Sequence, residues 1–286
     1  MAASPAIQKI AHHSRSISLP SRSHPLTLRV EEHLCRLRSS ELATSSSSSI
    51  CHNLAGLQDL YDSVDELLQS SVAQNSISSG PGKCVDWILD GSSLEVLDVC
   101  GNTRDILSHM KESLQDLQSC VRRRGAESSV ANEVSTYILS RKKGNKMIHK
   151  CLADMKKMEH DVSIEDNEIV TILSQVEKIT IAMFESILSF ISGTKAVTRS
   201  KRNSWSLVSK LMHTKPQEEK DTTEVVKADV ALNILISRKP CKAVDVKNIQ
   251  ELLEALEMSI QAVEVGLNSL FRSLIKTRVS LLNILK

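Results

Sequence analysis

The stretch VDVKNIQELLEALEMSIQAVEVGLNSLFRSLIKTRVSLLNILK, residues 244–286, decides the fold of this chain. Apolar residues recur in it at alternating steps of four and three, the spacing of one face of an α-helix. Ten of the eleven positions in this double row are apolar, and only Thr277 interrupts the pattern. The pattern predicts a helix of about 40 residues. We call the double row the seam; it consists of Ile249, Leu253, Leu256, Ile260, Val263, Leu267, Leu270, Leu274, Thr277, Leu281 and Ile284.

An apolar seam of this length needs a surface to pack against. That surface belongs either to other helices of the same chain or to a second copy in a coiled-coil homodimer. Further apolar residues widen the stripe beyond the narrow seam of a two-stranded coiled coil, which favours packing within one chain. These residues are Leu252, Val265, Phe271, Ile275 and Leu282.

The chain upstream also reads as helix. Helical spacing begins at Pro25 and resumes after a serine run at 45–49, which should cap the next helix. That next helix should stop near 75–81. Further helices are predicted at about 94–124, 128–158, 163–192 and 225–236, with Ser163 and Asp166 as N-terminal hydrogen-bond acceptors for the third. The predicted class is therefore all-α, an elongated bundle of about six to eight helices with a long C-terminal helix of heptad-like periodicity.

Composition indicates the domain organisation. Residues 1–24 are rich in Ser and Arg and should form an extended arm, while residues 25–286 should form a single helical bundle with a polar loop or linker at about 194–224. Aromatic residues are only 2% of the 286 residues, so aliphatic side chains must fill the core.

The net charge and the cysteine content indicate which partners and which cellular compartment to expect. The net charge of +2, with acids and bases interspersed, disfavours nucleic acid as a partner. Seven cysteines without a C-x-x-C pair favour free thiols and an intracellular, most simply cytoplasmic, location. The acid-free N-terminal segment leaves a plastid transit peptide as an alternative. No transmembrane segment is expected, because no long stretch is continuously apolar.

No pattern in the sequence indicates catalysis. Phosphate-binding glycine loops are absent, the histidines and cysteines lack metal-ligand spacing, and paired carboxylates fall on the polar side of a helix. We therefore expect no enzyme activity, no cofactor, no metal and no catalytic residue.

Two kinds of polar site remain as candidates. Clustered cations could bind anionic lipid headgroups or an acidic partner. Ser18 follows Arg15 at the spacing that basophilic kinases favour, and Ser204 follows KRN, so both are candidate phosphorylation sites. The candidate basic patch consists of Arg122, Arg123, Arg124, Arg141, Lys142, Lys143 and Lys146, with TRSKR at 198–202 as a further cluster.

Three blocks of this chain resemble a plant-specific family of helical proteins. They are HHSRSISLPSRSHPLTLRVEEHLCRLRSSE (12–41), SLEVLDVCGNTRDILSHMKESLQDLQSCVRRR (93–124) and SLFRSLIKTRVSLLNILK (269–286). The family is catalogued as a domain of unknown function related to the BYPASS proteins, and the resemblance spans roughly residues 13–286. It implies a land-plant source, an all-helical fold and a role in root and shoot development, in which BYPASS-type members restrain a mobile signal. It implies no catalytic residue.

Three functions are compatible with these observations. The first is a non-enzymatic developmental regulator that acts through protein contacts. The second is a peripheral membrane protein that binds anionic lipid through its basic clusters. The third is a small-metabolite binder or enzyme, which would need a polar pocket inside the bundle.

Overall fold

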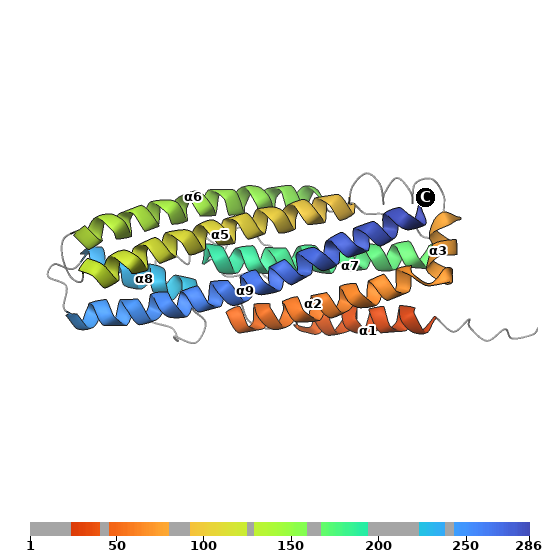
Figure 1. Cartoon of the computed structure of the whole chain (residues 1–286), viewed down its shortest axis with the longest axis horizontal. Coiled ribbons are helices and arrows are strands. Elements are labelled where there is room, and N and C mark those ends of the chain that lie inside the picture. Colours follow the sequence, from red (N-terminus) through yellow and green to blue (C-terminus); the bar gives the residue numbers. More distant parts are fainter. Residues whose placement is uncertain are drawn as a thin grey trace, which may run out of the picture.

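The computed structural model describes residues 24–40, 46–79, 92–124, 129–158, 167–193, 223–237 and 243–286. Every regular element in these ranges is an α-helix, which confirms the all-α class. The eight helices are α1 (Pro25–Ser40), α2 (Ser47–Leu68), α3 (Ser71–Ser78), α5 (Ser92–Arg124), α6 (Ser129–Lys157), α7 (Glu168–Ser192), α8 (Glu224–Ser237) and α9 (Ala243–Ile284). They form an elongated bundle in which the long helices run nearly side by side (Figure 1).

The C-terminal helix α9 organises this bundle. It has 42 residues and is therefore about 63 Å long. It crosses the face seen in Figure 1 between α5 and α2, and it packs against both of them and against α8. The partner surface that the seam requires thus lies within the same chain.

Helix α7 supplies the second large part of the core. Most residues of α7 are apolar, and buried side chains occur on most of its circumference. A helix that is apolar nearly all round must be covered on several sides. Consistent with this, α7 contacts α1, α2, α5 and α6, and also α3 and α8 near its two ends.

Helix ends follow capping chemistry, with two departures from the predictions. The serine run caps α2 as expected, since the Ser46 side chain accepts a hydrogen bond from the Ser49 backbone. Helix α7 begins later than predicted: Asn167 is its N-cap, accepting from the backbone N–H groups of Ile169 and Val170, and Ser163 and Asp166 lie outside the described residues. The predicted helix through residue 75 is broken, because Ser70 caps a separate helix, α3.

Glycine occurs at the end of α7 and at a close contact between α9 and α2. Gly193 has a φ of 73°, a left-handed conformation that closes α7. Gly266 of α9 lies against Leu54 of α2, so closely that a Cβ at Gly266 would be 2.9 Å from Leu54 Cδ1. The absence of a side chain at Gly266 therefore allows α2 and α9 to approach.

Candidate functional site

Eight of the eleven seam residues, which were predicted to form either the core or an interaction surface, lie in the core. Each of them is at most 5% exposed. Their side chains face α2, α5 and α8 and are not on the outer surface of the bundle. They are Leu253, Leu256, Ile260, Val263, Leu267, Leu270, Leu274 and Leu281.

The candidate basic patch is divided among three places. Arg122 and Arg123 are exposed near the end of α5, where Arg122 pairs with Glu254 of α9 at 3.1 Å and Arg123 donates to the Ser119 carbonyl. The Arg124 side chain lies outside the described residues. The remaining four cations are on α6, where Arg141 lies on the inner side of the helix and the three lysines lie on its outer side.

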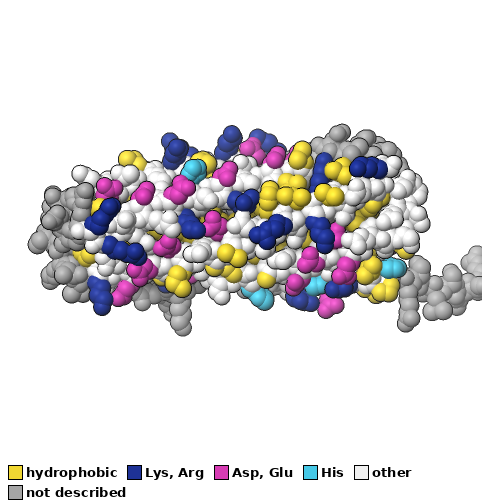
Figure 2. Space-filling view, in the orientation of Figure 1, with side chains coloured by type: hydrophobic (Ala, Val, Ile, Leu, Met, Phe, Trp, Pro, Cys, Tyr) yellow, Lys and Arg dark blue, Asp and Glu magenta, His cyan; other side chains and the backbone are white. Residues whose placement is uncertain are grey.

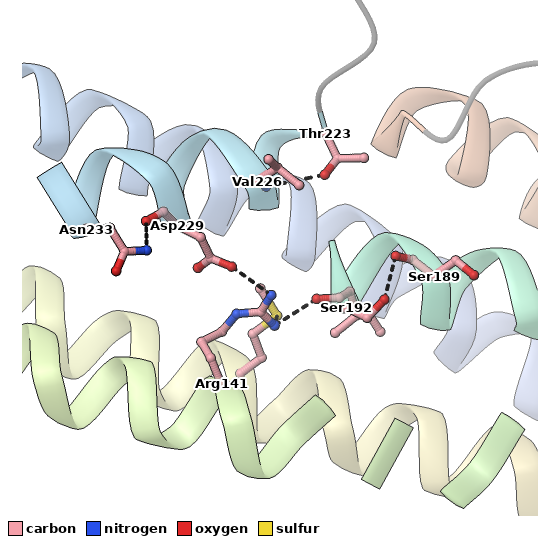
Figure 3. A network of polar contacts seen from close by, with 9 residues as sticks. Arg141, Ser189, Ser192, Thr223, Val226, Asp229 and Asn233 are labelled. Carbon is pink, nitrogen blue, oxygen red and sulfur yellow. Dashed lines mark hydrogen bonds and ion pairs between the residues drawn. The ribbon is translucent and has the colours of Figure 1, made fainter. Parts of the chain in front are cut away.

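Arg141 points into the bundle and is only 8% exposed (Figure 3). Its Nη1 donates to the Ile191 carbonyl in the last turn of α7 at 2.7 Å, and its Nη2 pairs with Asp229 of α8 at 3.1 Å. A cation is favourable near the carbonyl end of a helix. Arg141 therefore joins α6, α7 and α8 and is not available to a partner at the surface.

The outer side of α6 carries four exposed lysines, Lys142, Lys143, Lys146 and Lys150, which we call the lysine face. Within the described part of the chain, none of them has an ion-pair partner within 4 Å. The helix segment around them, residues 134–153, contains no acid. Lys and Arg side chains project along the upper edge of the molecule in Figure 2, over α6.

An apolar surface lies where the start of α5 meets the C-terminal half of α9. Leu94 of α5 is 49% exposed, and Ile275 and Val279 of α9 are 42% and 50% exposed. Phe271 and Leu282 are partly exposed and continue the same line of α9. Hydrophobic side chains gather over this junction in Figure 2. We call these five residues the α5–α9 patch.

Cations line the α9 side of the α5–α9 patch, whereas the exposed acids Glu95 and Asp98 lie beside Leu94 on its α5 side. Arg104 of α5 lies over the Phe271 ring, 4.6 Å from its centroid, and donates to Asn268 of α9. Glu264 is the last acid of the chain, so the part of α9 that bears the patch carries only positive charges. Lys276 is 60% exposed while it pairs with the buried Asp65 of α2 at 2.9 Å, and this contact raises the pKa of Lys276.

Thr277, which interrupts the seam, lines a small cavity of about 50 Å³ among α2, α5, α7 and α9. Thr277 is 6% exposed, and its hydroxyl has no hydrogen-bond partner among the described residues. Nearby, Thr180 donates its one hydroxyl proton to the Val176 carbonyl, so Tyr61 must donate to Thr180 in their 3.0 Å contact. The cavity has room for a few waters and is far smaller than ordinary ligand pockets.

A larger, open groove of about 530 Å³ lies at the end of the bundle between α3 and α9. Its polar lining consists of the amides of Gln69, Gln74, Asn75 and Asn283 and the hydroxyls of Ser78 and Ser280. These groups can hydrogen-bond to a neutral molecule, but the lining holds no ionisable side chain to act as an acid or base.

The other candidate groups are as follows. Ser18 and Ser204 lie outside the described residues. Five cysteines are described and are free thiols, and burial raises the pKa of Cys100 to about 12. Among the described residues, no three His, Cys, Asp or Glu side chains are grouped so that they could hold a metal ion. No helix in the described ranges has the length and apolarity that crossing a bilayer requires.

The comparisons with known proteins give one match. Neither the search of curated proteins nor the search of solved structures finds a match to this chain. The family model described as Protein BPS1 matches residues 53–284, which run from α2 to the end of α9. This span exceeds half of the chain and includes the lysine face and the α5–α9 patch. The chain therefore belongs to the Protein BPS1 family.

Proposed function

We propose that this protein is a non-enzymatic regulator that acts by binding another protein, in the root and shoot development that its resemblance to BYPASS proteins implies. The observation that carries this proposal is the α5–α9 patch. Exposed apolar surfaces with polar rims mark interaction sites, whereas isolated exposed apolar residues are ordinary. Here the exposed residues belong to two helices whose packing fixes their positions.

The shape and charge of the patch specify the partner. Phe271, Ile275, Val279 and Leu282 are spaced by four, four and three residues, so they form one line along α9, which packs against α5. A partner helix with apolar residues at the same spacing can lie along this line. Because the α9 side of the patch is positive while Glu95 and Asp98 lie on its α5 side, the flank of that helix that lies along α9 should be acidic. The occupant we propose is thus an amphipathic helix of a partner protein that is acidic on the flank along α9.

The test uses two matched pairs of substitutions. Ile275→Ser with Val279→Ser removes apolar contacts from the patch, and Val230→Ser with Ile234→Ser makes the same kind of change, at the same spacing, on α8. Val230 and Ile234 are 52% and 45% exposed, so both variants should fold. Each variant and the wild type are expressed in plants that lack the protein, and retained proteins are identified after affinity purification.

We expect that wild type and the α8 variant restore root and shoot growth and retain the same partner. The patch variant should lose both. Direct binding is then measured with the purified partner and with its acidic helix as a peptide. The proposal is wrong if the patch variant restores growth fully and retains every protein that wild type retains.

A further inference from the structure

The lysine face is a second surface that the proposed protein contact does not use. It lies on α6, which is at the edge of the bundle in Figure 1, whereas the α5–α9 patch lies on α5 and α9. Its four lysines occupy positions 142, 143, 146 and 150, which share one side of a helix. Among the described residues, the α6 side chains that bond to α5, α7 and α8, namely Ser140 and Arg141, lie outside this side.

Among the described residues, few acids lie near the positive charge of this side. Acids elsewhere on the surface commonly face cations, as in the pairs of Lys111 with Glu264 at 2.7 Å and Arg29 with Glu66 at 2.6 Å. On α6, Asp154 pairs with Lys157 at 2.8 Å and lies one turn from Lys150, whereas Lys142, Lys143 and Lys146 have no ion-pair partner within 4 Å among the described residues. Four cations on adjacent turns repel one another, and an anionic surface would relieve this repulsion.

Apolar side chains stand among these lysines. Leu139 is 64% exposed and Met147 is 38% exposed, and both lie on the side that carries the lysine face. This combination is typical of helices that lie on membranes, where lysines contact headgroups and apolar side chains enter the boundary with the acyl chains. Lysine is depleted in protein interfaces. The aromatic side chain of α6, Tyr137, is 2% exposed and cannot stack on bases.

The inner side of α6 keeps the lysine face in place. Arg141, next to Lys142 in sequence, is held by α7 and α8, and Tyr137 and Ile148 are buried on the same inner side. The helix therefore cannot rotate about its axis without breaking the buried Arg141 contacts. We propose that the lysine face is a docking site for membranes that carry anionic lipid headgroups.

The test is co-sedimentation of the full-length protein with phosphatidylcholine vesicles that contain or lack phosphatidylserine. Wild type should bind only the anionic vesicles, and less as KCl is raised. Each neutralised lysine should weaken binding about fivefold, so Lys143→Gln with Lys146→Gln should weaken it about 25-fold. The matched control is Lys178→Gln with Lys247→Gln, which removes the same charge from exposed positions on α7 and α9.

Three results would overturn the proposal. One is no binding of wild type to anionic vesicles, and another is an equal loss in both variants. The third is binding to poly-glutamate but not to vesicles with the same dependence on Lys143 and Lys146, which would assign the face to an acidic protein. The patch variant, Ile275→Ser with Val279→Ser, should bind anionic vesicles as wild type does, so this test is independent of the proposed protein contact.

Discussion

Gly266→Ala tests the close contact between Gly266 of α9 and Leu54 of α2. Alanine in place of glycine inside a helix ordinarily stabilises it by about 1 kcal/mol. At Gly266, however, the new Cβ would be 2.9 Å from Leu54 Cδ1 and 3.2 Å from Leu54 Cβ. Overpacking of this kind costs about 1 to 3 kcal/mol. We therefore expect Gly266→Ala to leave the free energy of unfolding unchanged or to lower it by up to about 2 kcal/mol.

Gly144→Ala is the matched control, because it lies in α6 and a Cβ there meets nothing within 4 Å. It should raise the free energy of unfolding by up to about 1 kcal/mol. Urea unfolding followed by circular dichroism measures both variants, and the difference between them should be about 1 to 3 kcal/mol. Adding Leu54→Ala should reduce the cost of Gly266→Ala, because the closest atom is removed. Equal stabilisation by both glycine substitutions would refute this close contact.

Three further predictions concern buried polar groups. Thr277→Val should raise the free energy of unfolding by about 1 kcal/mol in urea titrations, because it removes a buried, unpaired hydroxyl and keeps the shape; a loss of stability would show that the hydroxyl is bonded. Arg141→Met should lower the free energy of unfolding by about 2 to 3 kcal/mol, because Asp229 and the Ile191 carbonyl lose their partner. An unchanged free energy of unfolding would contradict this prediction. Burial raises the pKa of both tyrosines of the chain, Tyr61 and Tyr137, so ultraviolet titration of the native protein should show no tyrosinate near pH 10. Because the unfolded chain releases these protons at about pH 10, stability should fall as the pH rises above that value; normal ionisation in the folded protein would disprove the burial.

Structural features that depend on residues a few positions apart could be predicted from the sequence. The seam gave the class and the long terminal helix, and the serine run gave the start of α2, because helical spacing and capping depend on residues a few positions apart. The start of α7 was missed, since Ser163, Asp166 and Asn167 are all good caps and the sequence does not rank them. The break at Ser70 was missed because apolar spacing continues from α2 into α3.

Contacts between segments that are distant in the chain could not be predicted from the sequence. Arg141 was grouped with its neighbours Lys142 and Lys143 because they adjoin in sequence, although helical spacing places it with the buried residues Val134, Tyr137 and Ile148. That spacing was the signal that could have separated them. The α5–α9 patch had no such signal, because α5 and α9 are far apart in the chain and are brought together only by tertiary packing.

The central claim is that the α9 seam is the core of a single chain, which leaves the outer surfaces for partners. Light scattering behind size exclusion, applied to wild type and to Leu267→Glu with Leu274→Glu, tests this claim most directly. Both residues are at most 5% exposed, so two buried charges should unfold the variant. We predict a wild type with the 31.6 kDa mass of one chain and a variant without cooperative unfolding. A dimeric wild type whose variant is a folded monomer would contradict the account, since the seam would then join two chains.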